Sequence, residues 1–218
     1  MPQPKFKNII FDFDGVIADT LPFAVESALE INRELKLLPS ERVNPEELRS
    51  IDMHEFVKSF RLSKLQILFY LLKYRSKLSK KICETPVFQG IPEVLTELKI
   101  RNIKIGIATS NQKGLVLKFL KSHNIDNFDF IFSTIRLFHK EKLLNAAIKK
   151  YGLSRPETLY IGDEIRDITA ARSAGIKIAS VTWGFNFESV LTEHKPDFII
   201  YRPSELLDLV LDTEHNHN

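Results

Sequence analysis

Short apolar segments alternate with amphipathic segments along most of the chain. The apolar segments are rich in β-branched and aromatic residues and lack strict polar alternation, which is typical of strands buried on both faces. They cover residues 8–13, 103–109, 128–132, 159–162, 176–181 and 198–201. Helix-period segments precede or separate them at residues 92–100, 113–123, 141–151, 165–174 and 189–194. This alternation predicts a doubly wound α/β fold with a parallel sheet and right-handed crossovers.

One interval is too long for this rhythm. Asp12 at the end of the first segment and Thr109 at the end of the second are 97 residues apart, whereas a βαβ unit takes ~30 residues. The excess, residues 17–87, shows helix start signals at Thr20 and at Asn44, each followed closely by proline. We therefore expect a core of residues 1–16 and 88–218 and a smaller helical domain at 17–87, called the insert below.

The position of the insert suggests a lid. In parallel sheets, ligands bind beyond the carboxyl ends of the strands, and the insert follows directly after the first of these ends. A run of basic residues in it, from Lys58 to Lys81, contains no Asp or Glu. A solvated face balanced by the acidic residues earlier in the insert is the favoured interpretation. The alternative is a basic surface that attracts anionic substrates or partners.

Composition narrows the possible classes of protein. The 218 residues carry a net charge of +3, too small to indicate a nucleic-acid partner. The single cysteine, Cys83, permits no internal disulfide, which favours a cytoplasmic location. No apolar stretch approaches the ~20 residues that span a bilayer, so we expect no membrane association. The oligomeric state is left open.

Two aspartates follow the first strand in the sequence Asp12-Phe13-Asp14-Gly15. Carboxylates beside a buried apolar strand are costly unless a cation meets them. Mg²⁺ takes oxygen ligands and leaves positions open for phosphate, so a magnesium site is expected here. Two aspartates at this spacing are weak evidence alone, because an aspartate after a strand is often only a helix cap.

Polar residues at three further strand ends strengthen the case. Thr109, Ser110 and Asn111 follow the second strand and precede a helix, which suits phosphate oxygens. Lys140 begins the helix after the third strand, with Lys142 as a less favoured alternative. The fourth strand leads into Gly162-Asp163-Glu164-Ile165-Arg166-Asp167, where Glu164 is expected to cap the following helix. Together these residues predict a site for phosphate and a metal ion.

In this order, the motifs resemble those of the haloacid dehalogenase-like (HAD) hydrolase superfamily over nearly the whole chain. Asp12 to Val16 match its D-x-D-G-V/T motif, Thr109 its second motif, Lys140 its third, and residues 162–167 its G-D-x-x-x-D motif. The insert resembles the helical cap of one subclass. The segment 181–185 looks like the phosphoglycolate phosphatase-like branch.

The resemblance implies a mechanism. Asp12 would attack phosphorus and form an aspartyl-phosphate, and Asp14 would protonate the leaving group and then activate water. Asp14 also favours phosphoryl transfer, because the related dehalogenases lack this acid. Mg²⁺ would be held by Asp12, the Asp14 backbone carbonyl and Asp163, with Asp167 either a ligand or an acceptor that orients water. Thr109 and Lys140 would bind phosphate oxygens.

The expected activity is hydrolysis of a phosphate monoester on a small soluble metabolite. Arg49 and His54 of the insert are candidates for contact with the leaving group, the alternative being a solvated surface turn. Three other functions stay open: a phosphomutase, a receiver-like phosphorylation switch, and a nucleic-acid-binding module that uses the basic run.

Overall fold

The computed structural model describes residues 4–35, 46, 49–50, 63–134 and 140–211. Its centre is a six-stranded sheet in which every neighbouring pair is parallel, with the order β3-β2-β1-β4-β5-β6. The predicted α/β class and parallel sheet are confirmed. The strands are β1 (Asn8–Phe11), β2 (Lys104–Thr109), β3 (Phe130–Ser133), β4 (Thr158–Gly162), β5 (Lys177–Val181) and β6 (Phe198–Ile200).

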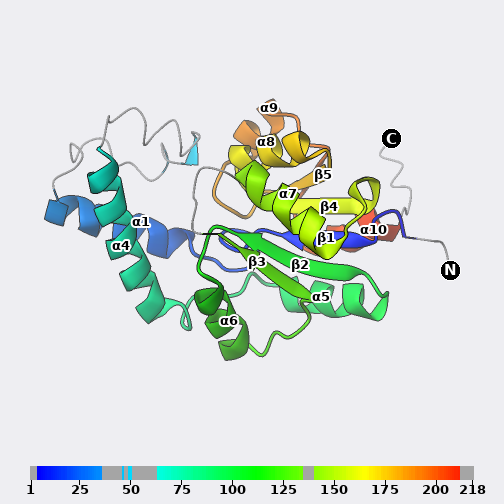
Figure 1. Ribbon diagram of the computed structural model, residues 1–218, viewed down its shortest axis with the longest axis horizontal. Coiled ribbons are helices and arrows are strands. Elements are labelled where there is room, and N and C mark those ends of the chain that lie inside the picture. Colours follow the sequence, from blue (N-terminus) through cyan, green and yellow to red (C-terminus); the bar gives the residue numbers. More distant parts are fainter. Residues whose placement is uncertain (1–3, 36–45, 47–48, 51–62, 135–139, 212–218) are drawn as a thin grey trace.

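Helices cover both faces of the sheet, as a doubly wound fold requires (Figure 1). Alternate side chains of β1 show the division, since Ile9 and Phe11 pack into one apolar cluster and Ile10 packs into the other. The first cluster includes side chains of α5 (Ile91–Ile100), α6 (Lys113–Ser122) and α10 (Glu205–Leu211). The second includes side chains of α7 (Lys140–Tyr151), α8 (Ile165–Ala174) and α9 (Glu188–Glu193).

The strand order places the carboxyl ends of β1 and β4 side by side. The chain runs outward from β1 to β2 and β3, then returns to add β4 on the other side of β1. Asp12 follows β1 directly and Asp163 follows β4 directly. In open parallel sheets this reversal point is where ligands bind, so the topology brings the two acidic motifs of the sequence to one place.

Two long helices of the insert lie beside each other and apart from the sheet (Figure 1). They are α1 (Leu21–Leu35) and α4 (Lys64–Lys81). Phe23 of α1 packs on Tyr74 of α4, with 5.8 Å between ring centroids. Ser63 caps α4, since its hydroxyl accepts from the Gln66 backbone N–H at 3.2 Å and the Gln66 side chain accepts from the Ser63 N–H at 2.8 Å.

The two connections between the insert and the core run next to each other. The Asp19 N–H donates to the Pro86 carbonyl at 2.9 Å, and the Phe88 N–H donates to the Ile17 carbonyl at 3.1 Å. These hydrogen bonds lie at the two ends of residues 17–87. The division into core and insert stays a prediction, but this paired connection is the kind of double linker that an inserted domain needs.

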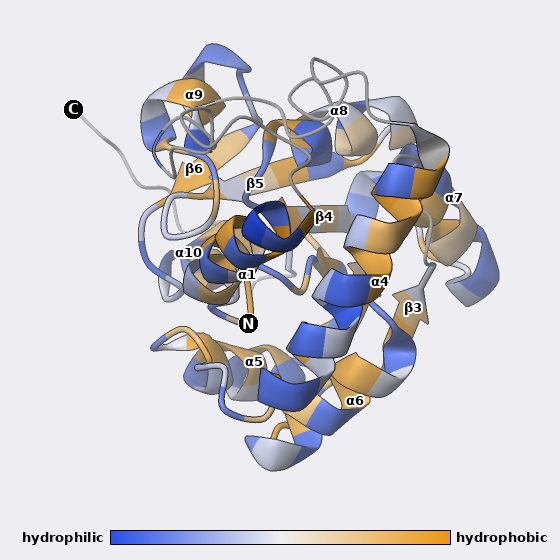
Figure 2. Cartoon of the chain, turned by 90° about the vertical axis from the view of Figure 1, so that its left-hand side faces the viewer, coloured by the Kyte–Doolittle hydropathy of each residue, from blue (hydrophilic) through white to orange (hydrophobic). Residues whose placement is uncertain are grey.

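The outer face of α4 is apolar and exposed. Figure 2 views the molecule from the side on which α1 and α4 lie, and it colours the apolar residues of α4 orange. Within the described residues, no helix is both long enough and apolar enough to cross a membrane. The exposed side chains are those of Leu65, Leu68, Phe69 and Leu72.

Candidate active site

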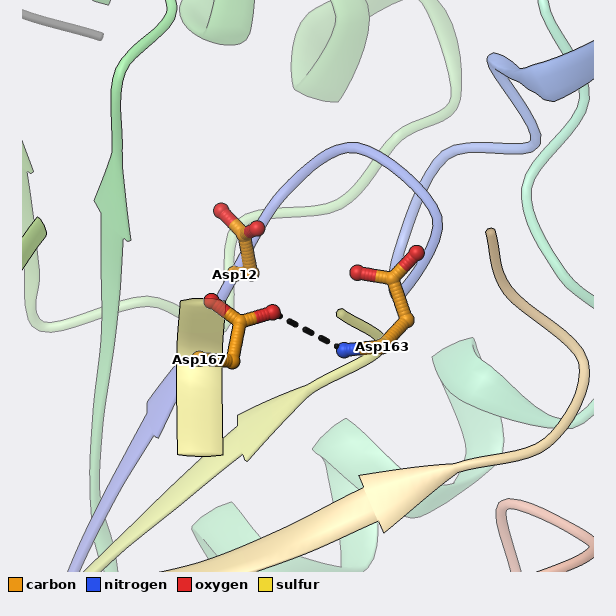
Figure 3. A group of neighbouring side chains, drawn as sticks. All are labelled: Asp12, Asp163 and Asp167. Carbon is orange, nitrogen blue, oxygen red and sulfur yellow. Dashed lines mark hydrogen bonds between the residues drawn. The ribbon is translucent and has the colours of Figure 1, made fainter. Parts of the chain in front are cut away.

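Three carboxylates converge at the carboxyl ends of β1 and β4 (Figure 3). Asp12, Asp163 and Asp167 each offer a carboxylate oxygen, and these oxygens lie within 4.8 Å of one another. All three side chains are buried; the most exposed of these residues, Asp12, shows only 3% of its surface. Like charges this close in a dry environment repel strongly, so the cluster requires compensating positive charge.

Lys140 supplies part of that charge. Its Nζ pairs with Asp12 Oδ2 and with Asp167 Oδ1, and all three groups are buried. Burial alone would lower the pKa of Lys140, but the carboxylates of Asp12 and Asp167 raise it above its ordinary value, so the amine stays charged. The lysine at the start of α7 is therefore placed against the motifs that follow β1 and β4.

Asp167 has hydrogen-bond donors on both carboxylate oxygens. Its Oδ2 accepts from the backbone N–H groups of Asp163 at 3.0 Å and Glu164 at 3.1 Å. Its Oδ1 faces Lys140 and accepts from the Tyr160 hydroxyl at 3.3 Å. Both oxygens thus have donors within the protein, and the role of Asp167, as a metal ligand or as an acceptor that orients water, stays a prediction. Glu164 is the N-cap residue of that helix, as predicted.

The two carboxylate oxygens of Asp163 differ in their contacts within the described residues. Its Oδ2 accepts from the Phe185 N–H at 2.7 Å, while its buried Oδ1 has no hydrogen-bond partner among the described residues. Burial, together with repulsion from Glu164 and Asp167, raises the pKa of Asp163 well above its ordinary value. A buried carboxylate oxygen with this chemistry could serve as a ligand for a cation.

Two glycines allow the chain to pack closely around Asp163. A Cβ atom at Gly15, which has a φ of +73°, would lie 1.9 Å from Asp163 Oδ2. A Cβ atom at Gly184 would lie 2.2 Å from Asp163 Cβ. Any larger residue at either position would displace this carboxylate, so the loop after β1 and the loop after β5 require glycine there.

The donors in the cluster fit a hard divalent cation. They are carboxylate oxygens, the ligands that Mg²⁺ prefers, and one of them has no partner in the described protein. Burial raises the pKa of Asp12 from 3.8 to about 7, although Lys140 opposes the shift. A bound cation would favour the charged form of Asp12, since it adds the positive charge that the cluster lacks.

Asp14 lies in the same loop as Asp12 but has different partners. Its carboxylate accepts from Asn111 Nδ2 at 3.1 and 3.3 Å and is also hydrogen-bonded to Thr20. Burial raises the pKa of Asp14, and the hydrogen bond to Thr20 partly opposes this shift. A raised pKa suits a carboxyl group that must carry a proton near neutral pH.

The residues after β2 reach the site from the other side of β1. Thr109 is fully buried, and its hydroxyl oxygen accepts from the Asn111 N–H at 2.9 Å. Ser110 between them is partly exposed. The sequence analysis expected Ser110 and Asn111 to bind phosphate; in the structure the Asn111 side chain holds Asp14. The phosphate roles of these residues stay predictions.

Of the two insert residues predicted to contact the leaving group, the structure describes only Arg49. Arg49 donates from Nε to the Phe185 carbonyl at 2.9 Å and from Nη2 to the Gly184 carbonyl at 3.1 Å. Its guanidinium thus contacts the loop after β5, a contact that sequence reasoning did not foresee. His54 lies outside the described residues.

Sequence reasoning also gave no role to Arg166. It pairs with Glu164 at 2.5 Å, and its buried Nε has no hydrogen-bond partner among the residues described. Burial raises the pKa of Asp14 and of Asp12, and the charge of Arg166 opposes this rise. Arg166 is therefore a second cation beside the acidic cluster. Its place inside the G-D-x-x-x-D motif was a signal, but periodicity alone does not show which way that side chain points.

Comparison with known proteins gives a consistent picture. Residues 9–181 match the family model described as haloacid dehalogenase-like hydrolase. A phosphoglycolate phosphatase of Synechococcus elongatus is 30% identical over 93% of this chain and 96% of its own length. The pyrophosphatase PpaX of Bacillus cereus is 27% identical over 95% of this chain and 98% of its own length.

A solved structure shares the same fold. The crystal structure of a predicted phosphatase from Clostridium acetobutylicum superposes with a TM-score of 0.81, covering 95% of this chain and 99% of that one. The two sequences are 20% identical, so this likeness concerns the fold alone. The family model spans all four motifs of the site.

Proposed function

Because the chain belongs to the haloacid dehalogenase-like hydrolase family, we propose that it is a magnesium-dependent phosphatase that hydrolyses a small phosphate monoester through an aspartyl-phosphate. The observation that supports this most is the meeting of Asp12, Lys140 and the two acids of the G-D-x-x-x-D motif in one buried cluster. These residues come from three separate parts of the sequence, and each group has a role in phosphoryl transfer.

Asp12 is the proposed nucleophile. One of its carboxylate oxygens attacks phosphorus in line, a P–O bond forms, and the bond between phosphorus and the leaving oxygen breaks. Asp14 gives its proton to that leaving oxygen. In the second half-reaction Asp14 takes a proton from water, the water oxygen attacks phosphorus, and the bond between phosphorus and the Asp12 oxygen breaks, which frees inorganic phosphate and restores the Asp12 carboxylate. The raised pKa of Asp14 supports its role as the acid.

The surrounding groups bind and neutralise charge. Lys140 and Thr109 are the proposed donors to the non-bridging phosphate oxygens. Asp12, the Asp14 backbone carbonyl and Asp163 would hold Mg²⁺, and Asp167 positions Lys140 and the start of α8. When bound, the metal ion reduces the repulsion between the anionic nucleophile and the anionic phosphate.

The substrate class follows from the relatives. We propose phosphoglycolate-like monoesters of small metabolites first, since the phosphoglycolate phosphatase matches nearly the whole chain. Inorganic pyrophosphate is the second candidate, because the pyrophosphatase PpaX also matches nearly end to end. We propose that the insert closes over the site as a cap and that the enzyme works in the cytoplasm.

The test is Asp12→Asn assayed with an aryl phosphate, 2-phosphoglycolate and inorganic pyrophosphate, each with magnesium and with a chelator. The wild-type protein should release phosphate only with magnesium, and Asp12→Asn should abolish release. Asp126→Asn, a change at an exposed loop residue, is the matched control and should leave the rates unchanged. Unaltered turnover by Asp12→Asn would refute the proposal.

Two further measurements address the alternatives. Accumulation of an isomeric phosphate ester without inorganic phosphate would indicate a phosphomutase. An aspartyl-phosphate that persists far beyond seconds would indicate a phosphorylation switch. Hydrolysis predicts stoichiometric inorganic phosphate and a short-lived intermediate.

A further inference from the structure

Arg49 is joined to the core by contacts from both its side chain and its backbone. The guanidinium donates to the carbonyls of Gly184 and Phe185 and stacks 4.3 Å from the centre of the Phe187 ring. The Arg49 carbonyl accepts from Asn186 Nδ2 at 2.9 Å and from the Phe187 N–H at 3.2 Å. One insert residue therefore contacts four consecutive residues of the loop between β5 and α9, called the β5–α9 loop (residues 182–187).

The same loop holds Asp163 on its other side. The Phe185 N–H donates to Asp163 Oδ2 at 2.7 Å, and the Asn186 N–H donates to the Asp163 carbonyl at 3.2 Å. Asn186 Oδ1 accepts from the N–H of Ile165, the first residue of α8, at 2.9 Å. The loop thus fixes Oδ2 of Asp163, whereas Oδ1 has no hydrogen-bond partner in the part of the chain that the structure describes and is the oxygen we expect to face a cation.

The backbone of Gly184 and Phe185 links the two sets of contacts, since the peptide group between them accepts from Arg49 Nη2 at its carbonyl and donates to Asp163 Oδ2 through its N–H. The Phe185 carbonyl accepts from Arg49 Nε. A change in the position of Arg49 would move these backbone groups and, with them, the carboxylate they hold. Side chains that orient metal ligands from outside the coordination sphere commonly affect metal affinity in this way.

We propose that Arg49 is a positioning residue that couples the insert to the metal site through the β5–α9 loop. The proposal rests on the proposed function only in that the acidic cluster binds a divalent cation. It assigns Arg49 a role in metal affinity, which differs from the contact with the leaving group for which Arg49 was a candidate from its sequence position. Because such coupling is reciprocal, metal binding should also tighten the contact between Arg49 and the loop.

The first experiment measures Mg²⁺ binding to the full chain by titration calorimetry without substrate. Arg49→Met should raise the dissociation constant about tenfold, within the range for residues that orient ligands. Arg49→Lys keeps the charge but lacks the planar fork that reaches two carbonyls, so its effect should be smaller. Arg33→Met is the control, because Arg33 lies on α1 and donates to the Leu29 carbonyl of its own helix.

Steady-state kinetics separates this role from substrate binding. At saturating magnesium, KM for an aryl phosphate should be the same in Arg49→Met and in the wild type, while the magnesium needed for half-maximal rate should rise. An unchanged Mg²⁺ dissociation constant together with a raised KM would overturn the proposal and support contact with the leaving group. If the methionine variant does not fold, the lysine variant decides by the same criterion.

A measurement on the wild-type protein is independent of any variant. Hydrogen exchange at the Phe187 N–H, which donates to Arg49, should slow when Mg²⁺ is added to the metal-free chain. Equal exchange with and without Mg²⁺ would contradict the coupling. A wild-type protein that binds Mg²⁺ as expected but hydrolyses no phosphate would count against the proposed function alone.

Discussion

The core and the insert both pair lysines with carboxylates, but in different surroundings. In the core, Lys140 meets Asp12 and Asp167 with 6% of its side chain exposed. In the insert, ion pairs join α4 to α1 through side chains that are between 32% and 58% exposed. These insert pairs are Lys73–Glu34, Lys77–Glu30 and Lys81–Glu26.

Exposed and buried ion pairs differ in how strongly the protein depends on them. Exposed pairs are screened by water and add little to stability, so the insert pairs should contribute little to the packing of α4 on α1. A buried cluster cannot be screened, and removing one partner leaves a charge unpaired. In the core, Lys140 offsets the buried charges of Asp12 and Asp167, and the same lysine is the proposed donor to phosphate.

The largest effect is expected from breaking the buried cluster with Lys140→Met. Asp12 and Asp167 would lose their shared cation, which costs about 3 kcal/mol of unfolding free energy or more. The loss should be greater at pH 8 than at pH 5, because the carboxylates can take up protons at the lower pH. Phosphatase activity should fall by about 100-fold or more, since a donor to the phosphate is removed.

Lys142→Met tests the alternative lysine. Lys142 lies two residues further along α7 and is exposed. The activity and the unfolding free energy of Lys142→Met should therefore match those of the wild type. Chemical denaturation and an aryl phosphate assay on the two variants make the comparison. A larger loss of activity in Lys142→Met would contradict the assignment of Lys140.

A second change should separate stability from function within the core. Asp163→Asn removes a buried charge whose Oδ1 has no partner in the described part of the protein, while an amide oxygen can still accept from the Phe185 N–H. The melting temperature, measured in a chelator, should therefore rise by about 2–4 °C, the shift expected for roughly 1 kcal/mol in a chain of this size. Activity should fall at least about 100-fold, because a proposed metal ligand is lost.

The pH dependence of the metal-free protein follows from the same carboxylates. Asp12, with a pKa raised from 3.8 to about 7, and Asp163, also raised, bind protons more tightly in the folded state. For Asp12 this folded-state advantage is present below pH ~4 and is lost as the pH rises through about 7, and the raised pKa of Asp163 acts in the same direction. In Asp163→Asn, the decrease in melting temperature over this window should be smaller. An equal decrease in both proteins would contradict the prediction.

Much of the core could be predicted because its signals are local. Six strands in the expected order of segments, and most of the helices between them, are visible as apolar runs and 3.6-residue periodicity, although the edge strands β3 and β6 are only partly buried. The short helix α10 (Glu205–Leu211) was not predicted, although Leu206 and Val210, four residues apart, pack into the core on one face of it. The convergence of Asp12 with Asp163 follows from parallel topology, which places strand ends at one edge.

The contacts of the insert with the core could not be predicted. Arg49 and Phe185 are 136 residues apart, and their contact is between a side chain and a backbone carbonyl, which leaves no residue-type signal in a sequence. Asn111 was assigned to phosphate on its strand-end position, yet its amide donates to Asp14. Position in the topology could be inferred, but the direction of a polar side chain depends on packing.

The smallest effect is expected from the insert pair Lys77–Glu30. Glu30→Gln removes one charge of a half-exposed pair that connects α1 to α4. The melting temperature should fall by less than about 2 °C, because water and the flexibility of both side chains cancel most of the attraction. The difference should disappear in 1 M salt, where screening acts within ~3 Å. Glu93→Gln is the matched control, because Glu93 is an exposed residue of α5, outside the insert. A decrease in Glu30→Gln as large as that in Lys140→Met would mean that the insert depends on its charges as the core does, and the contrast between the two regions would fail.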